Sequence, residues 1–119
     1  VYYQSGLRRY VTRLGLNAAK RLFLTAETLE ADELLQIGFL TELVPANELD
    51  ARTDALASQI AANAPLAVAG NKLGLTAIAC GTFDPDAHAA IRKRIAESED
   101  HKEAVTAWAE KRRPVFKGR

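Results

Sequence analysis

The side chains that could act as nucleophiles are few, and none stands in a catalytic motif. The chain has three serines, Ser5, Ser58 and Ser98, and one cysteine, Cys80. No serine occupies a G-x-S-x-G turn, the setting that exposes a nucleophile above a sheet. Cys80 falls on the apolar stripe of an expected helix, so we interpret it as a packed, unreactive thiol.

Metal and phosphate motifs are also missing. Neither His88 nor His101 stands four residues from a second histidine, so the H-E-x-x-H motif is absent and we predict no metal site. The sequence contains no Walker-type loop and no G-x-G-x-x-G turn. Three acidic pairs, Asp32–Glu33, Asp84/Asp86 and Glu99–Asp100, lie near expected helix starts, where the helix dipole stabilises them. Residues 1–119 therefore show no self-contained active site.

Composition indicates an ordinary folded protein with unevenly placed charge. The 119 residues are 48% apolar and 26% charged, which suits one domain over residues 1–119. The net charge of +1 hides two basic ends, residues 1–26 and 111–119, each with five basic residues and no acid. These ends either meet in space and attract phosphate or form the solvated faces of separate helices.

Two further features concern the origin of the chain. It begins at Val1 and contains no methionine, so we expect a piece of a longer protein. The single cysteine favours a reducing, cytoplasmic location. No apolar run approaches the ~20 residues that cross a bilayer, and we expect no contact with a membrane.

Helical spacing of apolar residues dominates the chain. We expect six or seven helices, with Gly15, Gly38 and Gly81 as stops and Pro65 and Asp84-Pro85 as starts. The helical segments cover residues 7–14, 18–22, 31–37, 49–63, 65–80, 85–98 and 100–108. Residues 39–44 suggest one short extended segment, and Asp100 with Glu103 fits a capping box. A chain with so little β-structure is mainly α and cannot build a doubly wound sheet alone.

The C-terminal stretch KRRPVFKGR mixes two kinds of residue. A purely solvated tail has no use for Val115 and Phe116, and a purely structural tail has little use for five cations. We therefore expect a surface near this end that is both apolar and anionic.

Three segments, in order, carry a resemblance to a known family. They are RLGLNAAKRLFLTAETLEADELLQIGFLTELVP, ANAPLAVAGNK and SEDHKEAVTAWAEKRRPVFKGR. Together they resemble the second half of the enoyl-CoA hydratase/isomerase (crotonase) family over nearly all of residues 5–119. The chain departs from the family pattern at YYQSGLRR, where a Gly-Gly-Thr/Ser turn is usual, and at Ala104 and Trp108, where Gly and Phe are common. These departures indicate a divergent member.

The resemblance implies the fold and the division of labour. This chain would be the C-terminal helical portion of a crotonase-like α/β fold. It would build trimer contacts and help to cover the acyl-CoA site. An N-terminal αβ spiral, absent from residues 1–119, would supply the two N–H groups that hold the thioester oxyanion and the catalytic carboxylates. The resemblance thus implies an acyl-CoA substrate, no other cofactor, a homo-oligomer, and no catalytic residue or activity in this chain by itself.

The resemblance also suggests five substrate-contacting residues. Phe116 would close the acyl or pantetheine end of a site, and Lys117, with Arg113, would face the CoA phosphates. Ser5 and Gly6 would lie on the loop that lines the acyl pocket.

Other interpretations stay open at this point. Phe116 could simply pack on its own helices while the cations stay solvated. The chain could be a non-catalytic helical module for oligomerisation. Nucleic-acid binding through Arg8, Arg9 and Arg13 is disfavoured, because the net charge is near zero and no helix-turn-helix or aromatic platform is visible.

Overall fold

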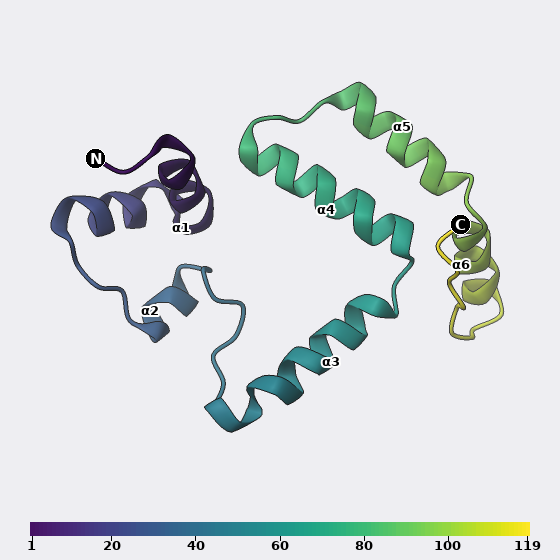
Figure 1. Ribbon diagram of the computed structural model, residues 1–119. Helices are drawn as coiled ribbons and strands as arrows, with labels where there is room; N and C mark the ends of the chain where they lie inside the picture. The colour runs from purple at the N-terminus through teal and green to yellow at the C-terminus, as the bar shows by residue number, and fades with distance from the viewer. The chain divides into compact units, whose positions relative to one another are not determined.

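The computed structural model describes all of residues 1–119, which form six α-helices, one short 3-10 helix and no strand. The chain divides into two compact units, Val1–Leu49 and Asp50–Arg119. Figure 1 labels the α-helices, whose bounds are α1 Gln4–Thr25, α2 Ala31–Gln36, α3 Leu49–Ala61, α4 Pro65–Cys80, α5 Pro85–Ala96 and α6 Glu99–Ala109. The mainly helical architecture predicted from the sequence is confirmed, whereas a single domain over residues 1–119 stays a prediction.

A glycine breaks α1 where the sequence predicts a helix end. Gly15 has φ 76° and ψ 163°, a backbone conformation that residues with a Cβ rarely adopt. The helix resumes after it, and Figure 1 shows the two stretches turned relative to one another. The rings of Tyr10 and Phe23 meet edge to face across the break, with their centroids 5.0 Å apart. The break therefore folds α1 back on itself around an aromatic contact.

The rest of the first unit is tied to α1 by charge. Arg21 pairs with Glu27 at 2.7 Å and with Glu33 of α2 at 2.5 Å. Gly38, at φ 77°, follows the end of α2 as predicted. Residues 39–44 form bends and irregular backbone, so the extended segment expected there is not a strand of a sheet.

Glycines in α4 allow close packing in the second unit. α4 and α5 run side by side in Figure 1 and are in contact. A Cβ placed on Gly70 would lie 2.8 Å from Ile95 Cδ1, and one on Gly74 would lie 3.0 Å from His88 Nε2. The two glycines therefore let the helices approach within van der Waals distance.

Side-chain caps set the starts of the last two helices. Asp84 accepts from the N–H groups of Asp86 and Ala87 at 2.9 and 3.1 Å, as predicted for the start of α5. Ser98, not Asp100, caps α6 by accepting from the N–H of His101 at 3.1 Å. The predicted Asp100 capping box is therefore wrong. Ser98 stands two residues before Asp100 and its hydroxyl takes the cap contact, which leaves Asp100 inside the helix.

Candidate functional site

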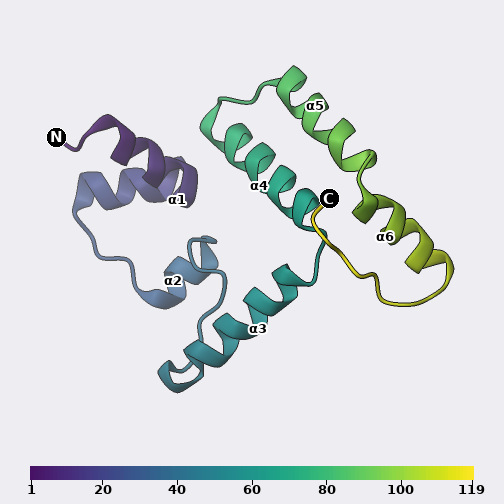
Figure 2. The same cartoon turned by 45° about the vertical axis from the view of Figure 1, so that its right-hand side comes forward.

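The C-terminal tail, residues 112–119, folds back along α6. The reversal follows Ala109 and uses Lys111 in the left-handed region at φ 54°. The N–H of Arg112 donates to the carbonyl of Ala107 at 3.0 Å and closes the turn. Figure 2 shows the tail passing beside α6 and ending near the start of α4. The tail is thus an ordered segment held against helices of its own unit.

Asp100 holds the far end of the tail. Its carboxylate oxygens accept from the N–H groups of Lys117 and Gly118 at 2.6 and 2.8 Å. Its own N–H donates to the carbonyl of Arg119 at 3.1 Å. Asp100 is only 2% exposed, so the two charge-assisted hydrogen bonds to its carboxylate offset the cost of removing that carboxylate from water.

Glu103, one helical turn further along α6, holds the near end of the tail. Its two oxygens accept from Arg112 Nη1 and Nη2 at 2.6 and 2.9 Å, and one of them also accepts from the N–H of Val115 at 2.8 Å. The hydrogen bonds from Arg112, and next the one from Val115, lower the pKa of Glu103 to about 2. This carboxyl is therefore ionised throughout the neutral range.

Successive tail side chains point to different sides. Val115 and Lys117 line a groove of about 580 Å³ against α6, whereas Phe116 lines a larger cavity of about 760 Å³ against α3 and α4. This alternation is that of an extended strand. The residues that line the larger cavity with Phe116 are Ile60, Asn63, Ala64, Ala67, Val68, Asn71, Lys72, Leu75 and Thr76.

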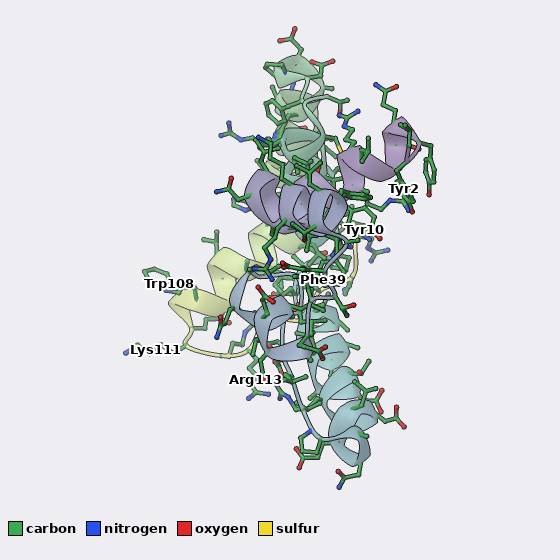
Figure 3. The ribbon with its side chains drawn as sticks, turned by 90° about the vertical axis from the view of Figure 1, so that its left-hand side faces the viewer. Tyr2, Tyr10, Phe39, Trp108, Lys111 and Arg113 are labelled. Atoms are coloured by element: carbon green, nitrogen blue, oxygen red, sulfur yellow. The ribbon has the colours of Figure 1, made fainter.

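The structure divides the five cations of residues 111–119 into two groups. Arg112 binds Glu103 and Glu110, and Arg119 pairs with Glu99 at 3.1 Å. The other three, Lys111, Arg113 and Lys117, are exposed and make no ion pair within 4.0 Å. Figure 3 shows Lys111 extending away from α6, with Arg113 beyond it on the tail. The second group is therefore exposed and without a carboxylate partner.

Ser5 and Gly6 lie in the first unit, in the first turn of α1. Ser5 is exposed and Gly6 is buried. A Cβ on Gly6 would collide with the ring of Tyr2, so packing of that ring is one reason for a glycine here. The placement of these two residues on an acyl-pocket loop stays a prediction.

Residues of α4 were missed as site candidates. Asn71 and Lys72 follow Val68 by three and four positions, which places them on the face of α4 that lines the cavity. That spacing was visible in the segment PLAVAGNKLGLT. It was not interpreted as a site because helical spacing is also typical of a helix that only packs in a core, whereas the tail combines apolar and cationic residues. No three His, Cys, Asp or Glu side chains gather where they could hold a metal ion. None of the helices has both the length and the apolar character of a membrane span.

Comparison with known proteins identifies the family. The structure by itself defines a helical protein with an ordered, cationic C-terminal tail beside an apolar cavity. The family model for enoyl-CoA hydratase/isomerase matches residues 3–119, and the chain belongs to this family. The resemblance seen in the sequence is confirmed.

Individual relatives agree with this assignment. The chain is 36% identical over 113 residues to a short-chain-enoyl-CoA hydratase of Clostridium acetobutylicum, covering 91% of this chain and 42% of that protein. It is 32% identical over 121 residues to a methylmalonyl-CoA decarboxylase of Escherichia coli, covering 98% and 46%. The chain thus spans less than half the length of these relatives.

Solved structures share the fold. An enoyl-CoA hydratase/carnithine racemase from Magnetospirillum magneticum superposes with a TM-score of 0.87 at 28% identity, covering 100% of this chain and 45% of that one. An enoyl-CoA hydratase from Mycobacterium tuberculosis gives 0.82 at 36% identity, covering 97% and 46%. These neighbours confirm the helical portion of a crotonase-like fold.

Proposed function

We propose that this chain covers the acyl-CoA site of an enoyl-CoA hydratase or isomerase, with the tail as one wall of that site. The observation that carries the proposal is the cavity of about 760 Å³ between α3, α4 and Phe116. Its lining is mainly apolar and includes the amides of Asn63 and Asn71. Such a lining suits the acyl and pantetheine parts of a thioester, in which apolar segments alternate with amides.

The unpaired cations support a phosphate contact beside that cavity. Lys72 stands on the cavity wall. Arg113 and Lys117 lie on the same tail as Phe116, and Lys117 lines the neighbouring groove against α6. None of the three makes an ion pair, so an anionic ligand would not have to displace a carboxylate. Lys117 and Arg113 are assigned to the CoA phosphates, and Lys72 joins them as a candidate.

Binding by the intact protein tests the proposal. Phe116→Ala raises the Kd for both crotonyl-CoA and crotonyl-pantetheine about fivefold to tenfold, because a half-buried Phe contributes ~1–1.5 kcal/mol. Lys117→Ala weakens crotonyl-CoA alone, by a few-fold at low salt, since only this ligand carries the phosphates. Val115→Ala, a truncation on the other side of the tail, is the control. Unchanged affinities in both variants would refute the proposed site.

Self-association is the second role that we propose for this chain. Val105 and Trp108 lie three residues apart on α6, and Trp108 is 85% exposed. Figure 3 shows Trp108 extending away from the helix. We assign this pair to a contact with a second copy of the protein, because an exposed indole beside an aliphatic side chain is typical of interface centres. Sedimentation of the intact protein tests it. Trp108→Glu shifts the species to lower mass, and an unchanged mass overturns the assignment.

A further inference from the structure

We propose that Asp100 and Glu103 are positioning residues that fix the register of the tail and thereby place Phe116 in the wall of the acyl-CoA site. We call the hydrogen bonds that join the tail to Asp100 and Glu103 the clamp. The clamp is visible in the structure, whereas its effect on substrate binding rests on the proposed function. Neither carboxylate lines the α3–α4 cavity, so each would act through the tail.

The burial of Asp100 ties that carboxylate to one register of the tail. It is 2% exposed, and its hydrogen-bond donors are the consecutive N–H groups of Lys117 and Gly118. A tail displaced from these donors would leave a buried charge without partners, which is strongly unfavourable. A slip of one residue would also exchange the two sides of the tail and turn Phe116 away from the cavity.

Glu103 provides a second point of attachment, which fixes the direction of the tail. Its two hydrogen bonds from the Arg112 guanidinium, the Arg112 fork, hold the turn after α6. It also accepts from the N–H of Val115, two residues before the first tail residue that Asp100 binds. Asp100 and Glu103 are one helical turn apart, and their tail partners follow in the reverse order. Two separated attachments define both the position and the orientation of the segment between them, which contains Phe116.

Gly118 completes the clamp. It adopts φ 76°, and a Cβ on it would lie 3.8 Å from Pro65 at the start of α4, an ordinary contact. The glycine is therefore required by the backbone conformation and not by lack of space. A side chain at position 118 would disfavour the backbone conformation that the clamp requires and would leave α6 unchanged.

Tryptic cleavage of the intact protein tests the clamp directly. The bond between Lys117 and Gly118 contains the N–H that Asp100 holds, and its cleavage is followed by mass spectrometry. Asp100→Asn replaces one acceptor oxygen with an NH2 group that faces a donor, so cleavage accelerates on the order of tenfold. The matched control is Asp86→Asn, because Asp86 occupies the same position in α5 and makes no tail contact. Cleavage at the same rate in both variants overturns the clamp.

A second variant covers the case in which Asp100→Asn fails to fold. Gly118→Ala leaves α6 intact and disfavours φ 76°, so cleavage after Lys117 accelerates there as well. An unchanged rate in this variant also overturns the clamp.

Kinetics with crotonyl-CoA separate positioning from general stability. If Asp100 acts through Phe116, Asp100→Asn raises KM about as much as Phe116→Ala, with kcat unchanged, and the double variant is no worse than either one. Additive effects, or a fall in kcat alone, overturn the positioning role. Faster cleavage combined with a KM that neither Asp100→Asn nor Phe116→Ala changes supports the clamp and refutes the proposed function instead.

Discussion

Substitution of Gly15 by alanine gives a result whose sign depends on the break in α1. Gly15 has φ 76° and ψ 163°, and a Cβ placed there would have no neighbour within 4 Å. The effect of Gly15→Ala is therefore confined to the backbone. In an unbroken helix the same substitution would stabilise the protein by ~0.8–1 kcal/mol, since alanine favours helix over glycine by that amount.

The magnitude follows from two opposing contributions. An L-residue forced into this Gly-only region costs ~1–3 kcal/mol. The alanine also restricts the unfolded chain, which returns ~0.4–1 kcal/mol. We expect Gly15→Ala to lower the free energy of unfolding by about 1–2 kcal/mol, opposite in sign to the result for a continuous helix.

Urea unfolding of the intact protein, followed by far-UV circular dichroism, measures the change. Gly81 provides the matched comparison, because its φ of 64° and ψ of 29° lie in the left-handed helical region that asparagine tolerates. Asparagine should therefore recover much of the stability lost in Gly81→Ala but little of that lost in Gly15→Ala. A stabilising Gly15→Ala would show that α1 runs straight through residue 15 and would refute the folded-back helix.

Three other measurements test separate parts of the fold. Ser98→Ala removes the cap of α6 and lowers the free energy of unfolding by ~1 kcal/mol, measured by urea titration. An unchanged free energy would mean that Ser98 does not cap this helix. Gly70→Val overpacks the α4–α5 contact at Ile95, 2.8 Å from the position of the added Cβ, and costs ~1–3 kcal/mol in the same assay, whereas a neutral result would mean that the helices separate freely. Glu103 has a pKa lowered from 4.5 to about 2, so its contribution is complete above pH 4.5 and is lost as the pH falls toward 2. The stability difference between wild type and Glu103→Gln should shrink over that pH range, and a difference that is constant down to pH 2 would contradict the Arg112 fork.

Local signals made most of the helical architecture predictable. Pro65 and Asp84-Pro85 mark helix starts, Gly15 breaks α1, and Gly38 and Gly81 follow helix ends. Each of these residues acts through its own φ or its own hydrogen bonds. Residues 39–44 had the composition of a strand but form none. Strand formation depends on a neighbouring segment, so composition alone could not decide it.

The site was less predictable, because its contacts join residues far apart in the sequence. Asp100 was interpreted as a cap since acids are common in the first turn of a helix, and only the folded tail shows that its partners are Lys117 and Gly118, 17 and 18 residues later. Asn71 and Lys72 had helical spacing but no visible neighbour, as Phe116 reaches them only after the chain reverses at Lys111. Such a contact cannot be inferred from spacing within one helix.

The tail cations show why a run of charge has no single meaning. Within nine residues, Arg112 and Arg119 are bound to acids of α6 and the turn after it, whereas Lys111, Arg113 and Lys117 make no ion pair. The first group holds the tail against the helix, and its loss would be measured as tail mobility. The second group has no such pair, and under the proposed function its loss would be measured as weaker, salt-dependent binding. The basic end was expected either to attract phosphate or to be the solvated face of a helix, but residues 112–119 form no helix and two of their cations hold internal acids. Neighbouring residues of an extended segment face different partners, so one run of charge can serve more than one purpose.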